Sequence, residues 1–187
     1  MRSPVAELLA AFAAAADRLG ARWYLFGAQA ALLYGAARLT ADADVTIDLG
    51  ARPTSELVDA LASSGFDLRI PDVDEFVERT RVVPLVHRAT GMPLDVVLAG
   101  PGIEELFLAR ARPRAVDDVT VPVASAEDVV VMKVLAGRAK DLDDATAILA
   151  ANEELDLAAV RSTLRLLEQA LDQSDLSPVL ERLLVRR

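Results

Sequence analysis

The sequence has no cysteine, and its only histidine is His87. The absence of cysteine excludes disulfide bonds and thiolate metal sites. A single histidine excludes any metal site that needs two or more imidazole ligands, and a Ser-His-Asp triad would have to use His87. We expect His87 to be structural, because it falls in a strand opposite the strand that holds Asp95.

Long apolar runs are also missing. The alanine-rich N-terminus is interrupted by Glu7 and Asp17, and its Leu and Phe spacing indicates an amphipathic helix. No segment approaches the uninterrupted length of a membrane span, and a convincing signal sequence is lacking. We therefore expect a cytoplasmic protein with no membrane partner.

Positive charge is scarce relative to negative charge. The net charge is -9, which disfavours a general nucleic-acid binder because such proteins usually carry a basic face. Two groups of arginines are interpreted as solvated surface, namely Arg79 with Arg81, and Arg110 with Arg112 and Arg114.

The chain has 187 residues, of which 53% are hydrophobic, so it can bury a substantial core. The patterns predict helices over 4–19, 28–37, 54–65, 103–111 and 126–136, and only helices after residue 140. They predict strands over 22–27, 44–49 and 117–124, and an antiparallel pair on either side of Thr90-Gly91. This order predicts an α/β (α+β) core over residues 1–124, followed by a helical C-terminal part over residues 125–187 that packs on it.

Two aspartates, Asp42 and Asp44, stand two residues apart at the start of a strand pattern. Residues i and i+2 of a strand point to the same side, so the two carboxylates can converge on one point. Two hard oxygen ligands suit Mg²⁺, and the ion would relieve the repulsion between them. A solvent-facing strand edge is the alternative reading of this pattern alone.

A third carboxylate, Asp95, lies within the apolar segment MPLDVVL. If this strand lies beside DVTIDL, Asp95 can join Asp42 and Asp44. Three carboxylates around one or two divalent ions suit in-line phosphoryl or nucleotidyl transfer, with Asp95 as general base or as a shared metal ligand.

Both lysines of the chain, Lys133 and Lys140, fall in the segment VMKVLAGRAKDLDD. A flexible point charge suits the triphosphate of a nucleotide, although a lysine at a helix end often only extends its ammonium group to solvent. The turn at Gly27-Ala28 leads from a strand into a helix, where backbone N–H groups can face an anion, or serve as an ordinary turn.

Together these motifs resemble the nucleotidyltransferase superfamily, in particular its AbiEii-like, toxin–antitoxin-associated branch. The segment FGAQAALLYGAARLTADADVTID resembles the first motif of that family through seven residues: Gly27, Ala30, Gly35, Arg38, Thr40, Asp42 and Asp44. MPLDVVL resembles the strand of the third carboxylate, and KVLAGRAKDLDDATAIL resembles a later motif that carries over to Lys133, Lys140, Asp141 and Asp144. The resemblance covers about residues 20–150.

The resemblance implies a palm-like mixed sheet and an enzyme that transfers a nucleoside monophosphate from an NTP, with Mg²⁺ or Mn²⁺ as cofactor. Asp42, Asp44 and Asp95 would be catalytic and bind the metal. The nucleotide-binding residues would be Gly27, Ala28, Arg38, Lys133 and Lys140, with Asp141 and Asp144 in support. Arg38 could also pair with Asp48 or with a C-terminal carboxylate.

The acceptor of the nucleotide is left open by the sequence. The AbiEii-like resemblance suggests a toxin that modifies tRNA and has a cognate antitoxin; a partner protein and a small molecule such as an aminoglycoside are the other acceptors. A non-enzyme reading is an inactive fold that binds nucleotide or protein. Ala28 favours it, since this residue has no hydroxyl where active family members have Gly-Ser or Gly-Gly at the turn.

Overall fold

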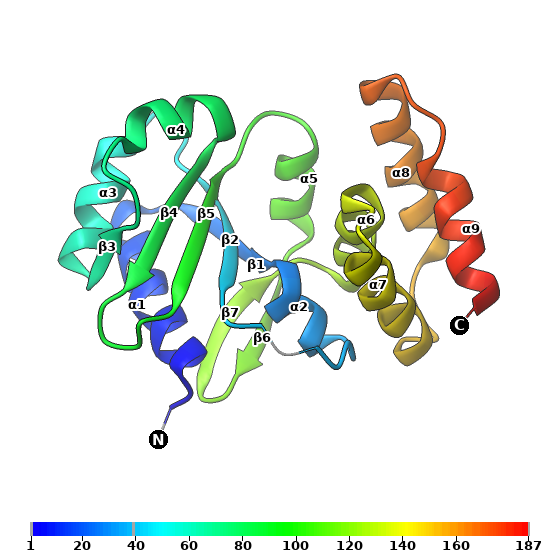
Figure 1. Cartoon of the computed structure of the whole chain (residues 1–187), viewed down its shortest axis with the longest axis horizontal. Coiled ribbons are helices and arrows are strands. Elements are labelled where there is room, and N and C mark those ends of the chain that lie inside the picture. The colour runs from blue at the N-terminus through cyan, green and yellow to red at the C-terminus, as the bar shows by residue number, and fades with distance from the viewer. Residues whose placement is uncertain (1, 39, 187) are drawn as a thin grey trace. The chain divides into compact units, whose positions relative to one another are not determined.

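The computed structural model describes residues 2–38 and 40–186, which form two compact units built from alternating segments of the chain (Figure 1). Residues 2–26 and 40–123 form the first unit, and residues 27–38 and 124–186 form the second. The elements of the first unit are α1 (Pro4–Leu19), β1 (Arg22–Phe26), β2 (Ala43–Asp48), α3 (Thr54–Ser63), β3 (Phe66–Leu68), α4 (Val73–Thr80), β4 (Val82–His87), β5 (Pro93–Leu98), α5 (Ile103–Arg110), β6 (Arg112–Val116) and β7 (Val119–Val123). Those of the second unit are α2 (Gly27–Leu33), α6 (Ala126–Ala136), α7 (Ala139–Ala151), α8 (Leu157–Leu171) and α9 (Leu176–Arg186).

The first unit is organised around a mixed sheet with the strand order β3-β4-β5-β2-β1-β7-β6. β2 runs parallel to β5, and β1 runs parallel to β7, whereas the other neighbours are antiparallel. The predicted mixed α/β sheet is thus confirmed. β2 and β5 lie side by side in the middle of the sheet, as the sequence analysis required for Asp95 to reach the Asp-x-Asp strand.

The two faces of this sheet differ in composition. Val45 and Ile47 are fully buried, and Ile47 is paired with Trp23, whose ring meets that of Phe12 in α1 with the centroids 4.9 Å apart. This face is therefore covered by α1, which also contacts α3 (Figure 1). Because strand side chains alternate, Asp44 lies on the opposite face. There α5 contacts β1 through an edge-to-face pair of Phe107 and Tyr24.

Helix α1 begins and ends where the sequence predicts. The hydroxyl of Ser3 accepts a hydrogen bond from the amide of Ala6 at 3.3 Å, and Pro4 occupies the first turn, where its missing N–H costs nothing. At the other end Gly20 adopts a left-handed conformation with φ 61°, and its amide bonds back to the carbonyl of Asp17.

The antiparallel pair β4–β5 also follows the prediction around Thr90-Gly91. The amide of His87 donates to the carbonyl of Met92, and the amide of Gly91 donates to the carbonyl of His87. His87 is only 4% exposed, and its ring lies against that of Phe66 with the centroids 5.0 Å apart. Its Nδ1 lies 3.0 Å from the hydroxyl of Thr90, so the residue is part of the packed interior of the hairpin.

The burial of His87 predicts a loss of stability at mildly acidic pH. Burial lowers the pKa of His87 below 6.5, with the charge of Arg88 adding to this effect and that of Glu7 opposing it. As the pH falls through 6.5, the unfolded chain therefore takes up the proton before the folded chain does, and the free energy of unfolding decreases.

Urea denaturation at pH 7.5, 6.5 and 5.5 tests this expectation. The wild type should lose more stability across the series than His87→Gln, whose side chain does not titrate. A wild type that gains stability on acidification relative to this variant would show that His87 is protonated in the fold.

The second unit consists of helices that surround buried faces of α6 and α7. Ser125 caps α6 by accepting from the amide of Asp128 at 3.1 Å, and Gly137 ends it with φ 65°. Helix α2 packs against α6 and α7. The hydroxyl of Tyr34 donates to the carbonyl of Ala124 at 2.8 Å, which fixes the segment after α2 on this unit.

Several predicted boundaries were wrong. The helix predicted over 28–37 begins at Gly27 and ends at Leu33, because the chain turns at Tyr34 and Gly35 adopts φ 102°. Three elements were not predicted at all: β3, α4 and β6. The strand predicted over 117–124 begins at Val119, since Asp117 takes a left-handed conformation in the turn that follows β6.

Gly35 is a position where alanine should be strongly destabilising. A Cβ atom there would lie 2.5 Å from the Cβ of Ala151, and the φ of 102° disfavours any other residue. We expect Gly35→Ala to lower the free energy of unfolding by about 2–3 kcal/mol. The matched control is Gly50→Ala, where φ is 58° but nothing lies within 4 Å of the added atom. Equal losses in urea denaturation would show that the contact with Ala151 relaxes.

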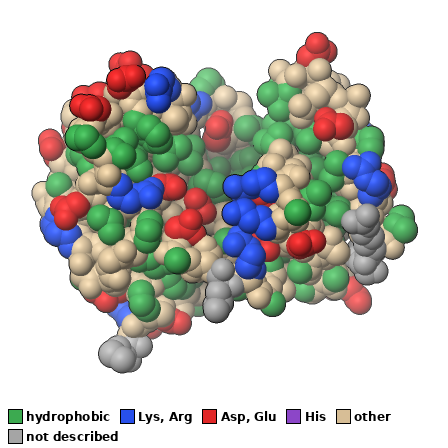
Figure 2. Space-filling model, viewed as in Figure 1, with side chains coloured by type: hydrophobic (Ala, Val, Ile, Leu, Met, Phe, Trp, Pro, Cys, Tyr) green, Lys and Arg blue, Asp and Glu red, His purple; other side chains and the backbone are tan. Residues whose placement is uncertain are grey.

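Charged and hydrophobic side chains are mixed over much of the face drawn in Figure 2, where several Lys and Arg side chains form one compact group. Positive charge is thus concentrated locally in a chain whose net charge is -9. In the part of the chain that the structure describes, no helix has both the length and the apolar character needed to cross a membrane.

Candidate active site

Asp44 and Asp95 are register partners on the adjacent parallel strands β2 and β5. Paired residues on neighbouring strands point to the same face, and neighbouring strands lie about 4.8 Å apart. The two carboxylates therefore emerge side by side from the face of the sheet opposite α1. Both residues are partly exposed, and 36% of the Asp95 side chain is accessible. This pair is the part of the predicted carboxylate site that the register places together.

Asp95 makes an ion pair that the sequence analysis missed. The guanidinium of Arg69 contacts its carboxylate, and the backbone amide of Arg69 donates to the carbonyl of Pro84 at 2.9 Å. Since Pro84 is paired with Asp95 across β4 and β5, this hydrogen bond places Arg69 beside the carboxylate. Arg69 directly follows β3, a strand of three residues, and so short a strand gives little periodic signal in the sequence.

Asp42 is exposed and lies just before β2, outside the helices and strands. The hydroxyl of Thr40 donates a hydrogen bond to its carboxylate, which orients a side chain that no strand holds. Asp42 thus stands next to the start of the strand that carries Asp44.

Among the described residues, no group of three or more His, Asp or Glu side chains is close enough to hold a metal ion. The pair of Asp44 and Asp95 is nevertheless a suitable donor set, because Mg²⁺ usually takes one or two carboxylates together with water and phosphate oxygens. Arg69 supplies the cationic partner of Asp95 in this structure.

A second group of charged residues lies within the other unit, around Lys133. This lysine is only 6% exposed, and its ammonium lies 3.0 Å from Asp141 and 2.7 Å from Asp144. Both aspartates are also buried. They face Lys133 because only two residues separate the end of α6 at Ala136 from the start of α7 at Ala139, so the first two turns of α7 return along α6.

Two arginines complete this cluster. The Nε of Arg138 donates to Asp141, and the Nη2 of Arg38 lies 3.5 Å from Asp144. Burial works to raise the pKa of the Asp141 carboxyl, but hydrogen bonds from Arg138 and Lys133 outweigh it and the pKa is lowered. Asp141 is thus held as a carboxylate by its two cationic partners.

The remaining predicted residues have different surroundings. Lys140 is exposed in the first turn of α7, whereas Ala28 is buried near the start of α2. Gly27 begins α2 with φ 67°, a conformation that favours glycine. The alternative pairing of Arg38 with Asp48 was wrong, because Asp48 pairs with Arg22 at 2.6 Å.

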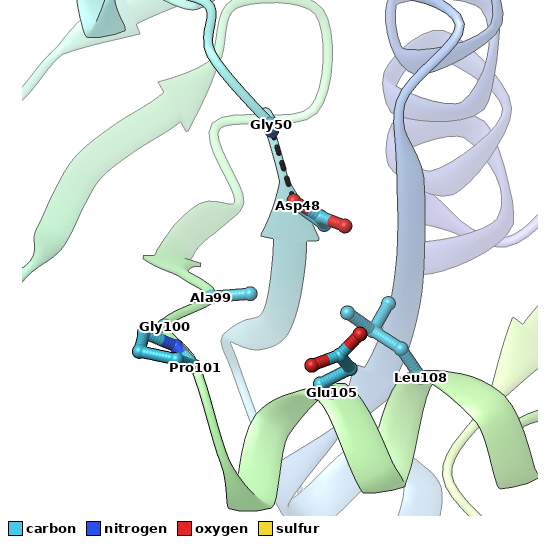
Figure 3. A pocket seen from close by; sticks show the side chains of 7 residues that line it. All are labelled: Asp48, Gly50, Ala99, Gly100, Pro101, Glu105 and Leu108. Atoms are coloured by element: carbon cyan, nitrogen blue, oxygen red, sulfur yellow. Dashed lines mark hydrogen bonds between the residues drawn. The ribbon is translucent and has the colours of Figure 1, made fainter.

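A cavity of about 240 Å³ lies at the far end of β2 from Asp44 (Figure 3). Asp48 and Glu105 provide its two acidic side chains, and Leu108 of α5 provides an apolar wall. The carboxylate of Asp48 accepts from the amide of Gly50 at 2.9 Å. This hydrogen bond, together with one from Arg22, lowers the pKa of Asp48. The cavity is separate from the carboxylate pair.

Comparison with solved structures places this fold among known ones. The antibiotic-resistance factor ANT(2″)-Ia, in its solution structure, superimposes with a TM-score of 0.63 at 17% identity, over 92% of this chain and 97% of the other. A crystal structure of ANT(2″)-Ia with adenylyl-2″-tobramycin gives a TM-score of 0.60 at 16% identity, over 87% and 98% of the two chains. An antigenic nucleotidyltransferase-like protein from Paracoccidioides brasiliensis gives 0.54 at 18% identity, over 95% and 90%.

The chain has a nucleotidyltransferase fold. The similarity extends over nearly the whole chain, including both units. The sequence matches no protein-family model and no curated protein. The structure thus supports the resemblance at the level of the fold, and the AbiEii-like branch stays a prediction.

Proposed function

We propose that this protein is a nucleotidyltransferase that moves a nucleoside monophosphate from an NTP to an acceptor hydroxyl. The observation that carries this proposal is the pair of Asp44 and Asp95, side by side on adjacent strands of a nucleotidyltransferase fold. Arg69 already pairs with Asp95, and a divalent cation would in addition offset the repulsion between two carboxylates placed this close together.

In the proposed reaction the acceptor oxygen attacks the α-phosphorus. The new O–P bond forms as the bond to the β-phosphate breaks, and pyrophosphate leaves with that bond's electron pair. Asp44 and Asp95, with Asp42 beside them, would hold Mg²⁺ or Mn²⁺, which neutralises charge on the phosphates. Asp95 is the candidate base for the hydroxyl proton, and to act in this way it would have to exchange Arg69 for substrate.

The nucleotide is assigned to Arg38 and Lys140, and to Gly27 and Ala28 at the start of α2. The sequence resemblance supports Gly27, Arg38 and Lys140, whereas Ala28 departs from the family pattern and would contribute only its backbone N–H group. Lys133, the fifth residue predicted to bind nucleotide, is buried and paired with the carboxylates of Asp141 and Asp144.

The acceptor is proposed as a small molecule, with tRNA and a partner protein as the alternatives. The small-molecule reading is favoured because ANT(2″)-Ia, which shares this fold, has been seen with adenylyl-2″-tobramycin. The net charge of -9 weighs against a large RNA footprint.

The test is transfer of label from each α-³²P-NTP in the presence of Mg²⁺. Three acceptor sets are compared: aminoglycosides such as tobramycin, total tRNA, and proteins from the cell extract. We expect label on one set with release of pyrophosphate. The absence of label on every set, together with Mg²⁺-dependent NTP binding, would instead support the inactive, nucleotide-binding reading.

A further inference from the structure

One of the two carboxylates in the proposed active site already has a cation, and that cation belongs to the protein. The Nη2 of Arg69 donates to Oδ1 of Asp95. Within the described ranges 2–38 and 40–186, neither side chain has any other hydrogen bond or ion pair. The pair is accessible, since 37% of the Arg69 side chain and 36% of the Asp95 side chain are exposed. A cation from solution would therefore meet Asp95 with its charge already balanced.

The backbone delivers Arg69 to this place. Its amide donates to the carbonyl of Pro84 at 2.9 Å, which extends the antiparallel pairing of β3 with β4 by one residue beyond Leu68. Pro84 is in turn the register partner of Asp95 on β5. Neighbouring strands lie about 4.8 Å apart, so Arg69 starts two strands, or about 10 Å, from Asp95. Only a long cationic side chain bridges that distance.

The four residues of this row lie on one face of the sheet. Across β3, β4, β5 and β2 the order is Arg69, Pro84, Asp95 and Asp44. Register partners share a face, so the Arg69 side chain extends over Pro84 toward the carboxylate pair. Pro84 is buried and has no long side chain of its own to obstruct this path. All four residues belong to the first unit, so the arrangement is complete within it.

A guanidinium and a divalent ion would compete for Asp95. Each favours the ionised carboxylate, but the two cations repel each other when they stand at the same group. A divalent ion that takes Asp44 and Asp95 as ligands therefore has to displace Arg69 or lose affinity to its charge. The ion pair with Arg69 is one that solvent reaches, and such pairs are weak enough to be exchanged.

We propose that Arg69 is a resident counter-cation that excludes divalent ions from Asp95 until it is displaced. Arg69 thus lowers the affinity of the free protein for metal and acts on the reaction through Asp95, as a positioning residue. This inference rests on the proposed function in taking Asp44 and Asp95 as the metal ligands. It adds that the protein carries its own competitor for that site.

Binding of Mn²⁺ to the protein without nucleotide tests the competition. Mn²⁺ takes the same oxygen ligands as Mg²⁺, and its free ion is measured by electron paramagnetic resonance. Arg69→Gln should tighten Mn²⁺ binding roughly fivefold, the value of one partly exposed ion pair. The matched control is Arg52→Gln, which removes the same charge from an exposed ion pair with Glu56 in the same unit and should leave the affinity unchanged. Equal affinities in wild type and Arg69→Gln would overturn the proposal.

A double variant shows whether Arg69 acts through Asp95. In the Asp95→Asn background, Arg69→Gln should no longer tighten Mn²⁺ binding, because the carboxylate for which the two cations compete is gone. The same gain in both backgrounds would show a general effect of charge and refute the competition.

Thermal unfolding separates this role from a purely structural one. Without metal, Arg69→Gln should unfold at a lower temperature than the wild type, because the ion pair is lost. Saturating Mn²⁺ should narrow this difference, since the variant binds the ion more tightly and gains more stability from it. A difference that is the same with and without Mn²⁺ would show that Arg69 only holds the end of β3 in place.

Separate outcomes distinguish this inference from the proposed function. If label transfer depends on Asp44 and Asp95 but Arg69→Gln leaves Mn²⁺ binding unchanged, the counter-cation is wrong and the transferase is supported. If Arg69→Gln tightens Mn²⁺ binding through Asp95 but no acceptor is labelled from any NTP, the counter-cation is supported and the transferase is wrong.

Discussion

Asp44→Asn is expected to lower the rate of nucleotidyl transfer about a thousandfold while leaving the fold intact. The asparagine keeps the size of the side chain but removes the charge that would bind the metal, and such stabilisation of phosphate charge is worth several kcal/mol in the transition state. Asp44 is partly exposed, so losing its charge should not destabilise the sheet. The measurement is single-turnover transfer of label from the preferred NTP.

The control for this experiment is Asp59→Asn, which removes one exposed carboxylate from α3 in the same unit. Its rate should match that of the wild type. The result that contradicts the assignment is an Asp44→Asn enzyme with at least a tenth of the wild-type rate. Asp95→Asn should lower the transfer rate to a similar extent, because the Asp95 carboxylate lies beside that of its register partner, Asp44.

Lys133→Met should destabilise the protein by about 3–5 kcal/mol. The change leaves two carboxylates without their shared ammonium, and these side chains are 1% and 5% exposed. Asp141 keeps Arg138 and Asp144 keeps Arg38 at 3.5 Å, but without the buried ammonium the desolvation of the two carboxylates is no longer offset. The free energy of unfolding in urea, measured near pH 7, reports the effect.

The sequence offers a matched control, since Lys140 is the only other lysine and is exposed. Lys140→Met should change stability by less than about 0.5 kcal/mol. Combining Lys133→Met with Asp141→Asn and Asp144→Asn should recover much of the loss, because no buried charge is then left unpaired. Similar losses in Lys133→Met and Lys140→Met would show that the cluster is not buried in solution.

Residue patterns were sufficient for the elements that carry the carboxylates. Alternation in DVTIDL put Asp44 and Val45 on opposite faces, and the structure confirms this. The sequence analysis left open whether the strand of Asp95 lies beside DVTIDL, and the register of β2 and β5 shows that it does. The inference for DVTIDL worked because a half-buried strand leaves a strict period of two in the sequence.

The two strands that were not predicted, β3 and β6, do not show this alternation of buried and exposed residues. All residues from Arg112 to Ala115 in β6 are exposed, so its sequence, RPRAV, shows no buried face. This strand lies at the edge of the sheet, where proline and arginine protect against pairing with another chain. β3 has only three residues, and Arg69, the partner of Asp95, directly follows it.

Lys133 shows a different limit of prediction from the sequence. A lysine on an apolar helix face is equally compatible with a ligand contact and with a buried ion pair. Its partners follow eight and eleven residues later, beyond the glycine that ends α6. Whether those aspartates face the lysine depends on the angle at which α7 turns back, and no local pattern specifies that angle.

The discontinuous second unit has a consequence for synthesis on the ribosome. Helix α2 ends at Leu33, and the next 92 residues are made before α6 begins at Ala126. Its packing partners, α6 and α7, therefore emerge only after the whole sheet. A helix of seven residues is marginal in water by itself. The segment that follows β1 therefore stays unstructured until the last third of the chain, which contains α6 and α7, has been synthesised.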